Sequence, residues 1–371
     1  MDGKYTMGDQ MMKVAKHGGN IYEVALERGI EMEEILDFSA NINPLGIPDS
    51  LKEAIMDNIH IIERYPDPEY KELVKAIADY HGVDQQWIAV GNGATELIFA
   101  LAASLNSKNS LILAPTFSEY ERALLKAKSE VHYYYLKEDN GFQIDEGFKK
   151  MLNPEIDLLV LCNPNNPTGQ FLKRQQMMEI LQHCREHGIR LVVDEAFIDF
   201  VEGGEMETMI ACMHEYNHLY VIRALTKFFA IPGLRLGYAV TSNENILGRI
   251  RDNREPWSIN SLAALAGEIV LKDKTYIQAT KNWIGEEKDN LFKALNAIEG
   301  IKAYKPEANY IFFSYGKSDN CLKEVLLSKK ILIRSCGNYK NLTDRFYRVA
   351  IKDRASNEKL IQALKEVIYE D

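Results

Sequence analysis

The sequence predicts an α/β protein: a large domain with a mainly parallel seven-stranded sheet, and a smaller α+β domain after it. Short β-branched and aliphatic runs alternate with longer amphipathic segments over the first part of the chain. Such alternation indicates βαβ units and a parallel sheet. After about Ser258 the pattern changes to long helical stretches, short strand candidates and a final helix. We therefore expect an N-terminal arm associated with the small domain (residues 1–45), a large domain (46–257) and a small domain (258–371).

The expected strands of the large domain follow one another at regular intervals. They are WIAV ending at Val90, LILA at Leu111–Ala114, VHYYY at Val131–Tyr135, DLLVLC ending at Cys162, IRLVVD ending at Asp194, LYVI ending at Ile222 and LGYAV ending at Val240. Helical patterns such as ATELIFALAASL and RQQMMEILQHCREHG lie between several of them. In the small domain NYIFF, ILIR and RFYRVAI are expected strands, and NEKLIQALKEVIYE the last helix. Ligands of open parallel sheets gather at the carboxyl ends of the strands, so the chemistry is sought there.

Composition restricts the class of protein. The chain has 371 residues, a net charge of −10 and no basic tract, which argues against nucleic acid or an anionic membrane as the main partner. No apolar run is long enough to span a membrane, and the N-terminus lacks the apolar core of a signal peptide. The five cysteines have no C-x-x-C spacing, so neither a disulfide framework nor a zinc site is expected. We expect a cytoplasmic protein without a metal.

Lys227 stands in unusual surroundings for a lysine. In VIRALTKFFAIPGLRLGY it follows a strand-like run and precedes Phe228, Phe229 and a Pro-Gly turn. Burial disfavours the charged form of a lysine and lowers its pKa. A neutral amine is a nucleophile toward carbonyl compounds, including pyridoxal phosphate. The alternative is a lysine at a strand end that keeps its ammonium group in water.

Two turns at strand ends could hold a phosphate or fix polar groups. IAVGNGATELIF reads as strand, glycine-rich turn and helix, so Gly93, Ala94 and Thr95 could cradle a phosphate at the helix N-terminus; a plain turn is the alternative. In LCNPNNPTG the two prolines restrict the backbone. They would hold the amides of Asn163, Asn165 and Asn166 in fixed directions, unless the loop has no function.

Asp194 in VVDEAFIDF comes at the carboxyl end of an expected strand. A carboxylate there can keep a pyridine nitrogen protonated, which makes a bound pyridoxal ring an electron sink; a helix N-cap is the other common role. Arg235 follows Lys227 across a Pro-Gly turn and could return to a phosphate. Together with an asparagine for the ring hydroxyl, these groups fit one cofactor, pyridoxal 5'-phosphate.

These motifs resemble those of a known family. GNGATE, PTFSEY, NPNNPTG, DEAFIDF, LTKFFAIPGLRLGY and YRVAI are similar to the fold-type I pyridoxal-phosphate enzymes, in their histidinol-phosphate-aminotransferase-like branch. The resemblance covers essentially the whole chain. HGGNIYEVALERGI, ILDFSANINPLGIP, IERYPD, PWSINSLAALAGE and ILIRSCGNY narrow it to the L-threonine-O-3-phosphate decarboxylases. It implies a homodimer that decarboxylates O-phospho-L-threonine to (R)-1-aminopropan-2-yl phosphate and CO2 for the nucleotide loop of cobalamin.

The resemblance also implies roles for individual residues. Lys227 matches the Schiff-base lysine, Asp194 the partner of the pyridine nitrogen, and Asn166 the asparagine at the ring hydroxyl. Phe117 matches the ring that stacks on the cofactor, and Tyr65 a phosphate contact from the partner subunit. The phosphate-binding set is matched by Gly93, Ala94, Thr95, Thr226 and Arg235. The substrate-binding set is matched by His17, Gly18, Asn41, Asn166, Arg334 and Arg348.

Two positions depart from the wider aminotransferase pattern, and other functions stay open. Phe197 replaces a tyrosine that donates to the ring hydroxyl, and Ala224 replaces a phosphate-binding serine.

A histidinol-phosphate-type aminotransferase would use the same lysine, acid and phosphate receptors. Decarboxylation of O-phospho-L-serine is a close variant, because a pocket discriminates one methylene by only about 1–3 kcal/mol. A non-catalytic pyridoxal-phosphate sensor is a further alternative, although no basic helix-turn-helix precedes the domain.

Overall fold

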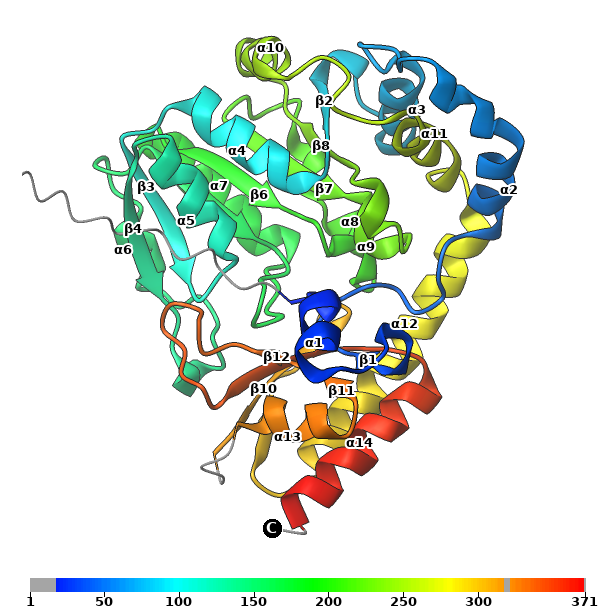
Figure 1. Cartoon of the computed structure of the whole chain (residues 1–371). Helices are drawn as coiled ribbons and strands as arrows, with labels where there is room; N and C mark the ends of the chain where they lie inside the picture. Colours follow the sequence, from blue (N-terminus) through cyan, green and yellow to red (C-terminus); the bar gives the residue numbers. More distant parts are fainter. Residues whose placement is uncertain (1–17, 317–320, 370–371) are drawn as a thin grey trace, which may run out of the picture.

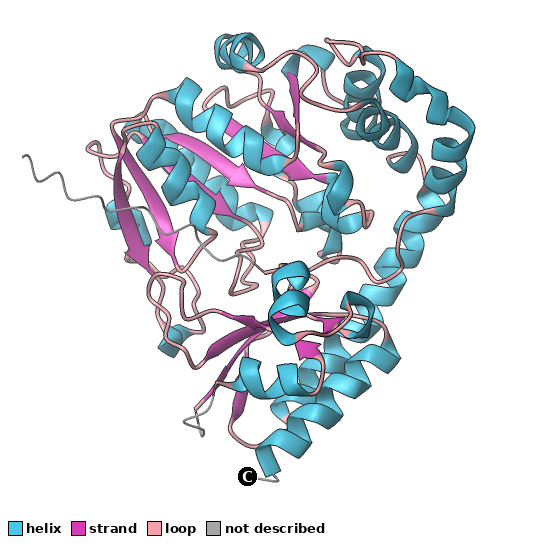
Figure 2. Cartoon of the chain, in the orientation of Figure 1, coloured by secondary structure: helices cyan, strands magenta, loops and turns pink. Residues whose placement is uncertain are grey.

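The computed structural model describes residues 18–316 and 321–369. Its centre is a seven-stranded sheet, on which helices pack from both sides (Figures 1 and 2). The strand order is β2 (Ile88–Gly91), β8 (Gly237–Val240), β7 (Leu219–Ala224), β6 (Arg190–Asp194), β5 (Leu158–Cys162), β3 (Asn109–Ala114) and β4 (Glu130–Tyr135). Only β8 is antiparallel to its neighbours. The predicted mainly parallel α/β fold is therefore confirmed.

The inner strands are largely apolar and buried because both faces of the sheet are covered, whereas β4 at the edge is partly exposed. In β6, Val192 packs into the core beneath α4 (Ala94–Leu105), α5 (Ser118–Lys126) and α10 (Glu244–Asn253). Its neighbours Leu191 and Val193 point to the opposite face, into the core that includes α7 (Arg174–His187). Each such fully buried aliphatic side chain contributes about 1.5–3 kcal/mol to folding.

Further helices surround the sheet and lead to the second unit. At the edge next to β2 lie α2 (Asp49–Asn58), α3 (Lys71–His81) and α11 (Ser261–Val270), and the long α12 (Lys274–Asn296) runs from there to the small unit (Figure 1). The short helices are α6 (Phe148–Met151), α8 (Gly204–Glu207) and α9 (Leu225–Phe228). The 3-10 turns are η1 (Met32–Glu34), η2 (Ile59–Glu63), η3 (Gln85–Trp87), η4 (Glu138–Asn140), η5 (Ile198–Phe200), η6 (Met209–Cys212) and η7 (Pro232–Leu234).

A four-stranded antiparallel sheet forms the centre of the smaller unit. Its order is β12 (Arg334–Ser335), β13 (Phe346–Ala350), β10 (Tyr310–Tyr315) and β9 (Ile301–Ala303), and α13 (Leu322–Ser328) and α14 (Arg354–Tyr369) pack beside it. The expected strand ILIR is wrong as a single element. It divides at Ile333, because β11 (Ile331–Leu332) pairs with β1 (Leu36–Asp37) whereas β12 pairs with β13.

The N-terminal segment packs on this smaller unit although it precedes the large sheet in sequence. α1 (Ile21–Arg28) and β1 lie against the C-terminal elements (Figure 1). Ala25 and Ile35 share a small core with Leu327 and Leu332. Phe38 then connects two strands, because its N–H donates to the carbonyl of Leu332 and its carbonyl accepts from the N–H of Ala350, both at 2.8 Å. Among the described helices, none has the length and apolarity needed to cross a membrane.

Candidate active site

The carboxyl ends of five parallel strands meet at one edge of the central sheet, and predicted site residues follow each of them. Gly93 comes after β2, Phe117 after β3 and Asn166 after β5. Asp194 ends β6, and Lys227 lies in α9 directly after β7. The topology therefore brings together residues that are far apart in sequence, as expected for a ligand site of an open α/β sheet.

Asp194 is buried and held in place by two donors. Its Oδ2 accepts a hydrogen bond of 2.7 Å from the Tyr120 hydroxyl, and its Oδ1 accepts one of 2.9 Å from the N–H of Ala196. Burial raises the pKa of Asp194, while these two hydrogen bonds and the charge of Lys227 lower it. The bond to Ala196 shows that the carboxylate also caps the following turn. Because burial is the larger effect, a cation placed against this carboxylate would be strongly stabilised.

Lys227 is a lysine whose charged form is disfavoured. Its Nζ lies 5.7 Å from the centre of the Phe197 ring. Burial, followed by the charges of Arg348 and Arg235, lowers the pKa of Lys227 to about 8, against a smaller opposing effect of Asp194. Part of the side chain stays exposed, but dehydration of the ammonium group dominates. A much larger fraction of Lys227 than of an ordinary lysine is therefore neutral and nucleophilic near neutral pH, which favours the reactive interpretation over a lysine kept in water.

A positively polarised cradle forms where α4 begins. Gly93 precedes the first turn of α4 with a φ of 86°, a conformation that favours glycine. A Cβ atom at Gly93 would lie 2.7 Å from Nη2 of Arg235, and one at Gly237 would lie 2.6 Å from the backbone nitrogen of Ala94. The guanidinium of Arg235 and the free N–H groups of α4, including that of Thr95, therefore share one space. This is the arrangement that binds phosphate.

Arg348 in β13 reaches from the small unit toward the strand ends. It is 5% exposed, and it donates to Oδ1 of Asn166 through Nη1 and to the carbonyl of Ser39 through Nη2, the latter at 2.9 Å. The Tyr339 hydroxyl also donates to Oδ1 of Asn166, at 3.3 Å. Within residues 18–316 and 321–369, no group hydrogen-bonds to the buried Nε atom of Arg348. This N–H is therefore open to an acceptor, and a charged guanidinium binds anions.

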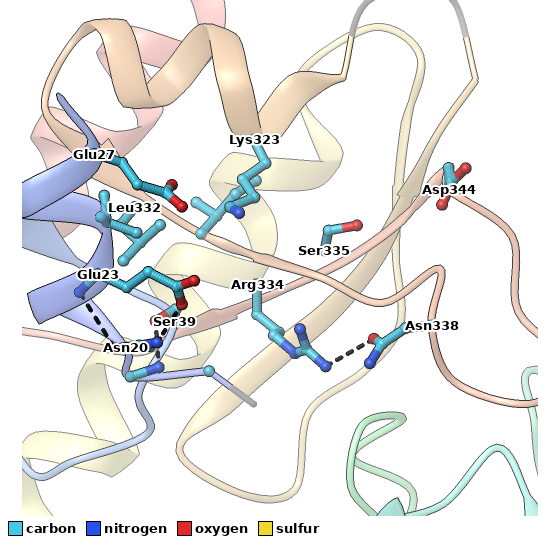
Figure 3. A pocket seen from close by; sticks show the side chains of 14 residues that line it. Asn20, Glu23, Glu27, Ser39, Lys323, Leu332, Arg334, Ser335, Asn338 and Asp344 are labelled. Carbon is cyan, nitrogen blue, oxygen red and sulfur yellow. Dashed lines mark hydrogen bonds between the residues drawn. The ribbon is translucent and has the colours of Figure 1, made fainter. Parts of the chain in front are cut away.

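Arg334 lies directly opposite Arg348 in the antiparallel pairing of β12 with β13. Its Nη2 donates to Oδ1 of Asn338 at 2.7 Å, and its Nε atom is also buried without a partner. Figure 3 shows Arg334 at the border of a cavity of about 750 Å³, between Ser39 on one side and Asn338 on the other. The cavity is lined on the N-terminal side by Gly18 and by residues of α1. Arg334 lines this cavity and Arg348 is its neighbour on the next strand, so the pair could serve a substrate with two anionic groups.

The remaining predicted residues differ in where the structure places them. Gly18 lines the cavity, and a Cβ there would lie 2.4 Å from the carbonyl of Ser39. Asn41 is buried, with its Oδ1 unpartnered. Thr226 is buried beside Lys227, whereas Tyr65 is 80% exposed and stacks at 4.7 Å on Trp257, on the outer surface. His17 lies outside the described residues.

Sequence reasoning missed four residues that hold the site together. These are Ser39, Tyr120, Asn338 and Tyr339, which contact Arg348, Asp194, Arg334 and Asn166 respectively. Each lies within a quoted motif, such as PTFSEY for Tyr120, but none was assigned a role from the sequence. In PTFSEY a signal was available, since Tyr120 comes about one helical turn after Phe117 and thus on the same side of the helix.

A model of aminotransferases of class I and II matches residues 33–364 of the chain. The chain belongs to this family. The threonine-phosphate decarboxylase of Salmonella typhimurium is 45% identical over 95% of this chain and 96% of its own length. The adenosylcobalamin biosynthesis bifunctional protein CobDQ of Leptospira interrogans is 33% identical over 96% of this chain, which corresponds to 42% of that longer protein.

Solved structures share the fold over nearly the whole chain of this family member. The histidinol-phosphate aminotransferase of Clostridium acetobutylicum has a TM-score of 0.85 at 36% identity, covering 90% of this chain and 99% of its own. The L-threonine-O-3-phosphate decarboxylase of Porphyromonas gingivalis has a TM-score of 0.79 at 27% identity, with the same coverage. The predicted fold-type I architecture is confirmed. Its known members include an aminotransferase and a decarboxylase, as the names of these two structures state.

The cofactor of this class I and II family enzyme is pyridoxal 5'-phosphate, and the geometry fits it. Asp194 offers a buried carboxylate for the pyridine nitrogen, Lys227 an amine for the aldehyde, and the Gly93 cradle a site for the phosphate. Arg235 and the Thr226 hydroxyl would complete that phosphate site. When bound, the cofactor accepts the electron pair that a substrate Cα–substituent bond releases.

Proposed function

We propose that this enzyme decarboxylates O-phospho-L-threonine to (R)-1-aminopropan-2-yl phosphate and CO2, for the linker of the cobalamin nucleotide loop. The observation that carries the proposal is the pair Arg334 and Arg348, which face one another with their Nε atoms buried and unpartnered. O-phospho-L-threonine has a phosphate and a carboxylate for these two receptors. Histidinol phosphate has the phosphate alone, although 2-oxoglutarate, the second substrate of such an aminotransferase, also has two anionic groups, so the product assay decides between the two reactions. The 45% identical threonine-phosphate decarboxylase supports the same assignment.

The position of each arginine suggests which anion it binds. Arg348 is close enough to Lys227 to lower its pKa and contacts Asn166 at the strand ends. We assign the substrate carboxylate, which must lie near the reacting carbon, to Arg348. Arg334 borders the large cavity, and we assign the substrate phosphate to it, together with Gly18, which also lines this cavity. Asn41 and His17 complete the proposed set by resemblance alone, and His17 lies outside the described residues.

The chain then has a group for each remaining task. Asp194, held by Tyr120, would keep its negative charge beside the ring nitrogen. Phe117 and Asn166 would hold the ring face and the ring hydroxyl. Lys227 exchanges a proton readily with a pKa of about 8, and we propose that it returns a proton to the substrate Cα after CO2 has left. Phe197 can donate no hydrogen bond, so Asn166 alone serves the ring hydroxyl among the predicted residues.

The deciding experiment is product analysis with O-phospho-L-threonine and no keto acid. Release of CO2 with aminopropanol phosphate, and loss of both in Lys227→Ala, would support decarboxylation. A reaction that starts only when 2-oxoglutarate is added, with formation of glutamate, would assign the enzyme as an aminotransferase. Parallel assays with O-phospho-L-serine measure how far the pocket discriminates the extra methyl group.

We also propose a homodimer with shared sites, located in the cytoplasm. Tyr65 and its ring neighbour Trp257 are exposed, and so are the large apolar side chains of Met56 and Ile62 in the preceding segment, at 67% and 60% exposure. Such a grouping is typical of a protein interface. All five cysteines are free thiols, which fits a reducing compartment. Mixing Lys227→Ala with a Tyr65→Ala chain tests the shared site, because a mixed dimer should regain activity at one of its two sites.

A further inference from the structure

Metal-ligating side chains also cluster at the carboxyl end of α7, outside the site described above. His183 and His187 are one helical turn apart on α7, and Glu186 lies between them in sequence. One ligand atom from each of the three residues lies within 4.8 Å of the other two. We propose that these residues form a zinc site of the His2Glu type, which revises the expectation of a protein without a metal and goes beyond the proposed decarboxylation.

Both imidazole rings are held by backbone carbonyl groups, which fixes the position of their protons. His183 Nε2 lies 2.9 Å from the carbonyl oxygen of Leu152, and His187 Nδ1 lies 2.9 Å from that of His183. Because a carbonyl only accepts, both nitrogens must donate. In the neutral rings, Nδ1 of His183 and Nε2 of His187 therefore keep their lone pairs. Histidines that bind metals typically donate their other N–H to a carbonyl or carboxylate in this way.

The surroundings also favour a cation. Glu186 is exposed, and only its Oε1 accepts from Gln182, at 2.9 Å, so Oε2 remains for an ion. His187 is the last residue of α7, and the carboxyl end of a helix carries a partial negative charge. The two ring centres are 4.2 Å apart and the planes are inclined by 32°. The proposal requires these partly exposed rings to turn until both lone pairs face one ion.

The position of the cluster separates it from the proposed reaction. α7 ends before the amino end of β6, whereas Asp194 lies at the carboxyl end of that strand. Three protein ligands leave the fourth position of a tetrahedral zinc to water. His183 is hydrogen-bonded to the carbonyl of Leu152, which directly follows α6. Bound zinc would therefore hold the carboxyl end of α7 against the end of α6. Its effect would be on stability and not on the chemistry of the substrate.

The test measures zinc binding to the tag-free holoenzyme in a Cys321→Ser background, because Cys321 is the exposed one of the free cysteines. Chelator-treated protein is titrated with Zn²⁺ in competition with a chromophoric chelator. We expect one zinc ion per chain and a higher thermal midpoint with zinc. His187→Gln and Glu186→Gln should each weaken zinc binding by at least about tenfold, the effect that loss of even an outer partner has. His132→Gln, the same change in β4, is the matched control and should bind as the parent does.

Zinc bound equally well by the parent, His187→Gln and Glu186→Gln would overturn the proposal, and so would no binding by the parent. Glu186 is exposed, so Glu186→Gln should fold normally and can decide the question if His187→Gln does not. The result is independent of the proposed function, because zinc affinity is measured without substrate. An enzyme that fails to decarboxylate O-phospho-L-threonine could still bind zinc, and the reverse also holds.

Discussion

Arg334 and Arg348 are direct cross-strand neighbours in the antiparallel pair β12–β13, and both carry a buried Nε without a partner. Like charges in such positions destabilise a sheet. A bound anion would offset the repulsion, so the protein should be more stable with phosphate or substrate than without. The arginine pair should therefore lower the free energy of unfolding of the ligand-free protein, and a bound anion should restore it.

Replacement of either arginine should therefore affect substrate use and stability in opposite directions. We expect Arg334→Gln and Arg348→Gln each to lower kcat/KM for O-phospho-L-threonine by about 10- to 100-fold, since a hydrogen bond to a charged group is worth about 1.5–3 kcal/mol. Both variants should lose the rise in thermal midpoint that phosphate gives to the parent. The control variant is Arg345→Gln, which removes an exposed arginine directly before β13 that is paired with Glu138. It should change neither kcat/KM nor the effect of phosphate on the thermal midpoint. A parent protein that phosphate does not stabilise would count against an anion site here.

Tyr120→Phe should weaken cofactor binding without disturbing the fold. The hydroxyl of Tyr120 donates to Asp194 and lowers the pKa of that carboxyl against the effect of burial. Without this donor the pKa of Asp194 rises further. When the pH is lowered, Asp194 of the variant therefore becomes protonated at a higher pH than Asp194 of the parent. We expect about tenfold weaker binding of pyridoxal phosphate. We also expect cofactor affinity to fall off at a higher pH than in the parent as the solution is made more acidic. Titration of the apoenzyme, followed by tryptophan fluorescence, measures both.

Tyr220→Phe is the matched control for that variant. Tyr220 is buried in the same core cluster as Tyr120, and its hydroxyl accepts from Asn243 at 3.1 Å, away from Asp194. Its cofactor affinity should equal that of the parent at every pH. If the two phenylalanine variants lose equal affinity, the contribution of Tyr120 is general packing and not support of Asp194.

The pKa of Lys227 predicts the pH dependence of cofactor capture. Only the neutral amine attacks an aldehyde, and burial lowers the pKa from the ordinary 10.5 to about 8. The rate at which apoenzyme takes up pyridoxal phosphate should therefore rise with pH and level off above a midpoint near pH 8. Stopped-flow absorbance measures this rate. A midpoint close to that of a free lysine would show that the amine is not dehydrated.

Gly93→Ala should remove cofactor binding by a steric effect. Its Cβ would lie 2.7 Å from Nη2 of Arg235, so the guanidinium must leave the cradle. The backbone of Gly93 (φ 86°, ψ 159°) lies in a region that is essentially restricted to glycine, which adds a cost of about 1–3 kcal/mol. Gly29→Ala places alanine in the left-handed helical region instead (φ 64°, ψ 37°) and meets nothing within 4 Å, so it controls for a positive φ without the clash. We expect both variants to lose stability and only Gly93→Ala to lose affinity for pyridoxal phosphate, measured by equilibrium dialysis.

The sequence is most informative where the structure depends on local pattern. Most strands of the large sheet appear as short apolar or aromatic runs, so all seven could be found, and their ends then indicated Asp194 and Lys227. The division of ILIR at Ile333 could not be found in this way, because it depends on pairing with β1 and β13, both remote in sequence. The pairing of Arg334 with Arg348 is likewise set by register and not by spacing.

Contacts between side chains of ordinary type were also beyond local reasoning. Tyr120 supports Asp194 only because α5 packs across the face of β6, and nothing in PTFSEY states this partner. His183 and His187 were visible as a pair at helical spacing, but their orientation depends on the carbonyl of Leu152. The assigned roles of the individual site residues and the domain boundaries stay predictions.

The pairing of β1 with β11 also bears on how the chain is made. Leu36 is synthesised early, yet its partner Ile331 follows roughly 300 residues later. On a ribosome the large sheet can complete its strands first, while Leu36–Asp37 waits without a partner. The strand Leu36–Asp37 can pair only after Ile331–Leu332 has been made, and the cavity beside Arg334, which includes Leu332, forms only after that pairing. A chain that stops before β11 would lack Leu332 and Arg334 and could not form the proposed substrate pocket.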